Sequence, residues 1–249
     1  DKALNFMTIS SPLGTQIPQA SGYAYGQKMA GNEAVTICYF GEGAASEGDF
    51  HAGVNMAAVL NCPVIFFCRN NGYAISTPSE EQFAGDGIAS RGIGYGVKTI
   101  RVDGNDPLAV FAATQEARRI ALAEMCPVLI EAMTYRLAAH STSDDPTGYR
   151  SRDEEDKWRA KDPIARMANW LTHKGWFDEK QNKAKVDKAR QDVLAALKVS
   201  ETIPICGIEE IVEDVYDSVP WHLQDQLTSL KAHIKQYPKK YPKTSGSVR

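Results

Sequence analysis

The sequence of 249 residues predicts an α/β fold, a mostly parallel sheet with helices on both faces, followed by a helical C-terminal extension. Four short runs rich in β-branched and aromatic residues occupy 34–40, 63–68, 97–102 and 127–133. Because these runs are apolar throughout rather than alternating, both faces of each strand are expected to be buried. Ligands of such sheets bind at the carboxyl ends of the strands.

The segments between the runs predict the remaining elements. Helices are expected over 46–60 and 107–124, whereas the connection from the second run to the third is mostly a glycine-rich loop. Ser46 and Asp49 form the S-x-x-D pattern that is typical of a helix start. Residues 136–157 are polar without an apolar period, and charged helical patterns occupy 158–199 and 219–237. We therefore expect an α/β domain over 1–152 and a helical region over 153–249.

Composition excludes several function classes. The net charge is −3, which does not favour nucleic acid or an anionic membrane. No apolar run approaches the roughly 18 residues of a membrane-spanning helix. The five cysteines lack C-x-x-C spacing, which indicates structural thiols in a reducing compartment. The chain begins without an initiator Met, so we interpret it as a fragment or a processed product.

Two polar motifs follow neighbouring strands. GEGAASEGD begins at Gly41, after the first run, and CRNNGY ends the second run. The helix start after Glu42 favours a phosphate, which a free carboxylate would repel unless a cation lay between them. The Glu42 carboxylate, the Asn71 amide oxygen and the Tyr73 carbonyl are oxygens that Mg²⁺ prefers. A dinucleotide site is the alternative, but it needs an acidic residue where this chain has Arg69 and two asparagines.

Here the sequence is similar to the thiamine diphosphate signature, G-D-G followed by N-N. The whole chain resembles the α subunits of the decarboxylating component of branched-chain 2-oxo acid dehydrogenase complexes. Glu42 departs from the aspartate more common in the wider family, and the residues just before His140 also vary among relatives. The resemblance rests on SSPLGTQIPQA (10–20), CYFGEGAASEGD (38–49), FFCRNNGYAIST (66–77), RVDGND (101–106), YRLAAHSTSDDPTGYRS (135–151) and DVYDSVPWHL (214–223).

The resemblance implies roles for individual residues. It implies Mg²⁺ ligation by Glu42, Asn71 and the Tyr73 carbonyl, and a catalytic, cofactor-contacting role for His140. Phosphorylation is implied at Ser141, with Ser151 as a second site. Further contacts to thiamine diphosphate are implied for Ser11, Gly43, Ala44 and Arg69, and a structural K⁺ site for Ser10, Pro12, Thr15 and Gln16.

The implied activity is oxidative decarboxylation of branched-chain 2-oxo acids with reductive acylation of a lipoyl group on a partner acyltransferase. The implied partners are a β subunit in an α2β2 heterotetramer, the acyltransferase core and a regulatory kinase and phosphatase, in the mitochondrial matrix. The helical region is expected to pack on the α/β domain and on partner subunits. A further N-terminal stretch is implied, and this chain is expected to be inactive alone. A pyruvate-specific α subunit, a nicotinamide dehydrogenase and a non-catalytic fragment remain alternatives.

Overall fold

The computed structural model describes residues 5–203 and 206–241. The chain divides into two compact units, Asp1–Trp176 and Phe177–Arg249, and each is described by itself. The expected boundary after residue 152 is therefore too early. The first two helices of the charged region belong to the first unit, where Trp158 stacks on Tyr135 and Arg166 forms an ion pair with Asp103.

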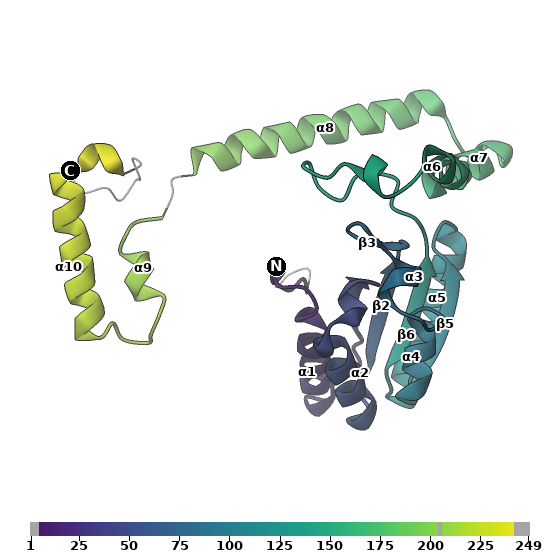
Figure 1. The fold of residues 1–249 in the computed structure, drawn as a ribbon, viewed down its shortest axis with the longest axis horizontal. Coiled ribbons are helices and arrows are strands. Elements are labelled where there is room, and N and C mark those ends of the chain that lie inside the picture. Colours follow the sequence, from purple (N-terminus) through teal and green to yellow (C-terminus); the bar gives the residue numbers. More distant parts are fainter. Residues whose placement is uncertain (1–4, 204–205, 242–249) are drawn as a thin grey trace. The chain divides into compact units, whose positions relative to one another are not determined.

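The first unit is built on a four-stranded parallel sheet (Figure 1). Its order β1-β2-β6-β5 places β2 and β6 in the centre and β1 and β5 at the edges. All four predicted apolar runs are confirmed as strands, which are β1 (Thr36–Gly41), β2 (Val64–Asn70), β5 (Lys98–Asp103) and β6 (Val128–Met133).

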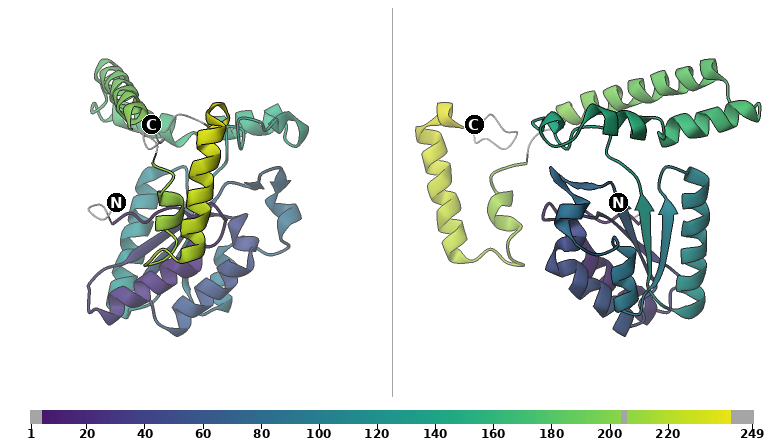
Figure 2. Two further views of the ribbon diagram at one scale, coloured as in Figure 1. Left: turned by 90° about the vertical axis from the view of Figure 1, so that its left-hand side faces the viewer. Right: turned by 45° about the vertical axis from the view of Figure 1, so that its right-hand side comes forward.

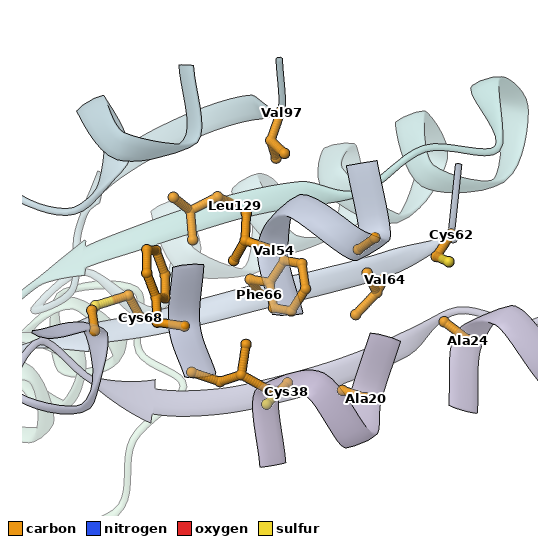
Figure 3. Packing of buried hydrophobic residues seen from close by; sticks show 14 of the residues in the cluster. Ala20, Ala24, Cys38, Val54, Cys62, Val64, Phe66, Cys68, Val97 and Leu129 are labelled. Atoms are coloured by element: carbon orange, nitrogen blue, oxygen red, sulfur yellow. The ribbon is translucent and has the colours of Figure 1, made fainter. Parts of the chain in front are cut away.

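Helices cover both faces of this sheet, as the continuous apolar runs predicted. The helices α1 (Gln16–Met29), α2 (Gly48–Val59) and α4 (Ala89–Gly94) pack on one face, and α5 (Pro107–Glu124) packs on the other (Figure 1, Figure 2). In β2, Phe66 and Cys68 join the first core cluster and Phe67 joins the second. Figure 3 shows the first cluster, where small side chains of α1 lie close to the sheet.

Local sequence explains where α5 begins, whereas a contact with a distant residue accompanies a later start of α2 than expected. The Asp106 side chain accepts hydrogen bonds from the N–H groups of Leu108 and Ala109, and Pro107 occupies the first helical position. Ser46 does not cap α2, because its hydroxyl donates to Gln82 Oε1 instead. A 3-10 turn, η2 (Ala44–Ser46), comes first and α2 starts at Gly48.

The connection from β2 to β5 is more ordered than expected. The prediction of a glycine-rich loop is wrong for most of it, because local hydrogen bonds form short elements between the glycines. A two-stranded antiparallel hairpin pairs Tyr73 with Pro78. The elements are β3 (Tyr73–Ala74), β4 (Thr77–Pro78), α3 (Ser79–Gln82) and α4.

Helices dominate the chain after β6, as predicted, although one begins inside the segment that lacks an apolar period. The first unit continues with η3 (Pro146–Gly148), α6 (Arg152–Arg159) and α7 (Pro163–His173). The second unit contains α8 (Glu179–Thr202), α9 (Glu210–Glu213), α10 (Trp221–Gln236) and η4 (Pro238–Lys240). Within the described ranges, no helix combines the length and the apolar character needed to cross a membrane.

Candidate cofactor and metal site

Glu42 and Asn71 lie together at one edge of the sheet. Each follows the end of its strand, and the parallel register pairs Gly41 of β1 with Arg69 of β2. The backbone N–H of Asn71 donates to Glu42 Oε2 at 3.0 Å. The structure therefore brings together the two side chains that the motifs predicted as neighbours.

The Glu42 carboxylate is buried and only half satisfied. The residue is 1% exposed, and its Oε1 atom is buried without a hydrogen-bond partner among the described residues. Burial raises the pKa of the Glu42 carboxyl, although the Asn71 N–H and the charges of Arg136 and Arg69 act in the opposite direction. An unpaired buried oxygen costs free energy, and a bound cation at this position would remove that cost.

The turn after β2 carries the other two predicted ligand oxygens, and each of them accepts a hydrogen bond within the protein. Asn71 Oδ1 accepts from the Tyr73 N–H at 3.1 Å, and Gly72 adopts a φ of 85°. The Tyr73 carbonyl accepts from Arg136 Nη1 at 3.4 Å. One carboxylate, one amide oxygen and one backbone carbonyl suit Mg²⁺ with water and phosphate completing the shell. Within the described chain there is no cluster of three or more His, Cys, Asp or Glu side chains that could bind a metal.

The predicted diphosphate contacts differ in how close they lie to this turn. A Cβ on Gly43 would stand 2.9 Å from the Ala74 Cβ, so the absence of a side chain lets the two turns pack together. Ala44 is buried directly after it. Arg69 is exposed at the end of β2, and its charge acts on Glu42. Ser11 is exposed in the bend before α1.

The four residues predicted to bind K⁺ form one tight turn before α1. Thr15 Oγ1 donates to the Pro12 carbonyl at 3.2 Å, and Gln16 Nε2 donates to the Ser10 carbonyl at 2.7 Å. Two hydrogen bonds thus link these residues across the turn. K⁺ binding stays a prediction.

A hydrogen-bonded relay connects the backbone of His140 to the Tyr73 turn. Asp144 Oδ2 accepts from the His140 N–H at 2.8 Å and from the Tyr149 hydroxyl at 2.7 Å. Arg136 Nη2 donates to the Tyr149 hydroxyl at 2.9 Å, and the same guanidinium reaches the Tyr73 carbonyl. The His140 ring is exposed. The relay holds the loop next to the turn that carries the predicted metal ligands.

Arg150 anchors the base of that loop. It is 7% exposed, donates to the backbone carbonyls of residues 136, 137 and 138, and pairs with Glu155 at 2.8 Å. Ser141 is exposed, whereas the Ser151 hydroxyl caps α6 by accepting from the Glu154 N–H at 3.2 Å. Sequence reasoning missed Arg136, Asp144, Tyr149 and Arg150 as loop anchors, because polar residues in a polar segment give no signal of burial.

Glu131, in the centre of β6, is a second buried carboxylate that sequence reasoning missed. Its side chain is fully buried and accepts four hydrogen bonds, from Asn70 Nδ2 at 2.8 Å, the Ile88 and Ala89 N–H groups at 2.9 Å each and Arg101 Nε at 3.0 Å. Burial acts to raise the pKa of Glu131, but these hydrogen bonds outweigh it and hold the pKa below its ordinary value. A charged residue inside the apolar run PVLIEAM was the available signal.

Gly87 makes the approach to Glu131 possible. It adopts a φ of 67°, and a Cβ there would stand 2.6 Å from Glu131 Oε1 and 2.7 Å from Arg101 Nη2. A side chain at this position would therefore collide with the ion pair as well as strain the backbone. The segment before α4 is held against β6 by this close contact.

Comparison with known proteins identifies the family. The family model "Dehydrogenase E1 component" matches residues 1–209. The chain belongs to this family. It is 56% identical over 242 residues to the human 2-oxoisovalerate dehydrogenase subunit alpha, mitochondrial, covering 97% of this chain and 54% of the human protein. The protein of the same name from Dictyostelium discoideum is 55% identical over 243 residues, covering 97% of this chain and 55% of that protein.

The chain spans about half the length of these curated relatives. A solved structure from Mycobacterium smegmatis aligns with 51% of this chain and 23% of its own, at a TM-score of 0.42 and 24% identity. That likeness is too slight to carry an argument. Family membership rests on the family model and on the curated relatives.

Proposed function

We propose that this chain carries the metal and diphosphate half of an E1 enzyme that uses thiamine diphosphate, Mg²⁺ and a structural K⁺. The single observation that carries this proposal is the buried Glu42 Oε1 beside the Asn71 turn, which has no hydrogen-bond partner in the part of the chain that the structure describes. The relatives are named 2-oxoisovalerate dehydrogenase subunit alpha, mitochondrial. We therefore propose oxidative decarboxylation of branched-chain 2-oxo acids, in the mitochondrial matrix, with acyl transfer to the lipoyl group of a partner acyltransferase.

Different residues at this edge of the sheet are proposed to bind the metal and the diphosphate. Glu42, Asn71 and the Tyr73 carbonyl would hold Mg²⁺, while Gly43 and Ala44 let the backbone approach the diphosphate. Arg69 supplies a fixed positive charge at the same edge. When bound, thiamine diphosphate supplies the carbon nucleophile and the electron sink for decarboxylation.

His140 is the proposed catalytic group of this chain. Imidazole can hold or release a proton near neutral pH, which suits proton transfer near the reacting carbon. The relay through Asp144, Tyr149 and Arg136 fixes the backbone of His140 relative to the metal turn. The exposed ring leaves room for a β subunit to complete the site, so we expect no activity from this chain alone.

The same loop is the proposed point of regulation. Ser141 is exposed and follows His140, so a kinase can reach its hydroxyl. A phosphoryl group adds about −1.5 to −2 charge beside a bound diphosphate and beside Asp144, and repulsion would release the loop. Ser151 is the second proposed site, and its hydroxyl caps α6, where a phosphate also fits the helix N-terminus.

The test uses the full-length α chain assembled with its β subunit. Glu42→Ala and Asn71→Ala each remove a proposed Mg²⁺ ligand, so calorimetric titration with thiamine diphosphate and Mg²⁺ should show affinity losses above about 100-fold. Glu33→Ala is the matched control, because Glu33 is an exposed glutamate before the opposite end of β1. Unchanged affinity in both site variants contradicts the metal assignment.

Substrate class is tested on the same assembly. Turnover of 3-methyl-2-oxobutanoate and of pyruvate is compared with a lipoyl-bearing acceptor present. Preference for the branched substrate supports the proposal, whereas preference for pyruvate favours the pyruvate-specific α subunit.

A further inference from the structure

We propose that Glu131 is a positioning residue for the metal turn, acting through Asn70. This inference rests on the proposed function, because the turn matters only if it holds the metal. Asn70 is the last residue of β2 and directly precedes the proposed ligand Asn71. Glu131 lies in the neighbouring strand β6 and contacts no proposed ligand itself.

Asn70 bridges two groups with opposite requirements. Its Nδ2 donates to Glu131 Oε1 at 2.8 Å, and its Oδ1 accepts from the Gly72 N–H at 3.1 Å. Carboxylate needs a donor and a backbone N–H needs an acceptor, so only one orientation of the Asn70 amide satisfies both. The side chain is almost fully buried, at 4% exposure, and solvent offers little alternative partner.

Fixing Gly72 fixes the ligands on either side of it. Gly72 has a φ of 85°, its N–H is held by Asn70, and its carbonyl accepts from the Ser79 N–H at 2.9 Å. The Asn70 bond is therefore the restraint on the N–H side of a residue that is otherwise conformationally permissive. Asn71 precedes it and Tyr73 follows it, so the conformation of Gly72 sets the direction of both proposed ligand oxygens. A preformed turn lowers the entropy cost of binding, which raises the affinity for metal.

Three further donors, besides Asn70, hold the Glu131 carboxylate in place. The Ile88 and Ala89 N–H groups and Arg101 Nε occupy its remaining acceptor positions. The carboxylate cannot rotate away from Asn70 without breaking these bonds. Glu131 thereby joins the metal turn to the segment that begins α4, and both depend on its charge.

The experiment is a double-mutant cycle in the full-length α/β assembly. Asn70→Ala, Glu131→Gln and the double variant are titrated with Mg²⁺ in the presence of thiamine diphosphate. Loss of an outer partner of a metal ligand typically weakens binding by about 10- to 100-fold, so each single variant should lose at least about 10-fold. Because Glu131 acts through Asn70, the double variant should bind no more weakly than the weaker of the two singles.

Amide exchange without metal separates positioning from general damage. Asn70→Ala should speed exchange at Gly72 and Tyr73 while leaving Ile88 and Ala89 slow. Glu131→Gln should speed exchange in both segments. Val64→Ala is the control, because it removes a buried side chain from the other end of β2. It should lower the melting temperature and leave Mg²⁺ affinity unchanged.

The outcomes distinguish this inference from the proposed function. A wild-type assembly without Mg²⁺-dependent cofactor binding overturns both. If the wild-type assembly binds Mg²⁺ with the cofactor and Asn70→Ala binds it equally well, only the positioning role is overturned. Asn70→Ala alone gives this answer if Glu131→Gln does not assemble. If the fold-losses of Mg²⁺ affinity of the two single variants multiply in the double variant, the positioning role is also overturned, because Glu131 would then act independently of Asn70.

Discussion

Glu42, which follows the end of β1, and Glu131, inside β6, are both buried carboxylates, but they differ in how far their oxygens are hydrogen-bonded. Glu131 accepts four hydrogen bonds, and its pKa lies below the ordinary value. Glu42 accepts a hydrogen bond from the Asn71 N–H, its Oε1 has no partner within residues 5–203 and 206–241, and its pKa is raised. The difference teaches that burial alone does not mark a binding group. A saturated carboxylate stabilises the fold, whereas an unsatisfied one is free to bind a cation.

The largest expected effect on stability is at Glu131. Glu131→Gln removes the charge from a buried acceptor of four donors and places an amide N–H₂ against some of them. Loss of hydrogen bonds to a charged group costs about 1.5–3 kcal/mol each, and partial compensation leaves a net loss of roughly 2–3 kcal/mol. We expect the melting temperature of the assembly to fall by about 4–10 °C at fixed protein concentration. No decrease would contradict the structural role assigned to Glu131.

The pH dependence of that effect sharpens the comparison. The pKa of Glu131 is lower in the folded chain than its ordinary value of 4.5, so its stabilisation is complete above about pH 4.5. It is lost as pH falls from there through the folded pKa, because over that range the unfolded chain takes up a proton more readily than the folded chain. The gap in melting temperature between wild type and Glu131→Gln should therefore narrow below pH 4.5. A gap that stays constant down to pH 3 contradicts this.

Glu42→Gln should change stability in the opposite direction. In the protein without metal and cofactor, the charge of Glu42 is buried and its Oε1 has no partner among the described residues. An amide of the same shape removes the cost of burying the charge. We expect stabilisation of about 1 kcal/mol, or a rise in melting temperature of about 2–4 °C, with loss of Mg²⁺ affinity. A clear decrease in melting temperature would show that the Glu42 charge is already satisfied in the protein.

The smallest effect is expected at Asp86, the exposed partner of Arg101. Arg101 Nη1 lies 2.9 Å from Asp86 Oδ1, but the Asp86 side chain is 83% exposed. Exposed ion pairs contribute less than about 1 kcal/mol. Asp86→Asn should therefore shift the melting temperature far less than Glu131→Gln, although both remove a carboxylate from the same guanidinium. Equal shifts in melting temperature for Asp86→Asn and Glu131→Gln would mean that burial does not determine how much each carboxylate stabilises the fold.

The framework of the sheet was predictable because its signals are local. The four strands confirm the apolar runs, and α5 occupies Pro107–Glu124 as predicted because Asp106 and Pro107 mark its start. The pairing of Glu42 with Asn71 followed from the rule that parallel strands end at the same edge. These inferences needed only periodicity, turn residues and strand direction.

The parts that could not be predicted depend on contacts between distant segments. The four donors to Glu131 come from β2, α4 and its preceding residue, and β5, and no local pattern joins them. The prediction that α2 starts at Ser46 failed for the same reason. The Ser46 hydroxyl donates to Gln82, and the S-x-x-D pattern contains no information about that distant residue. The capping rule describes what is available to a helix, and a tertiary partner can take precedence over it.

The close contact at Gly87 limits which substitutions the sequence can accept during evolution. Gly87, Asn70, Arg101 and Glu131 each satisfy or accommodate another member of the set. A side chain at Gly87 would collide with the ion pair, and replacement of Asn70, Arg101 or Glu131 would leave a polar group without its partner. Single changes therefore carry a stability cost that concerted changes can avoid. In a saturation library, we expect variants at these four positions to be recovered in compensated combinations, for instance with apolar residues replacing the charged pair, and rarely one at a time.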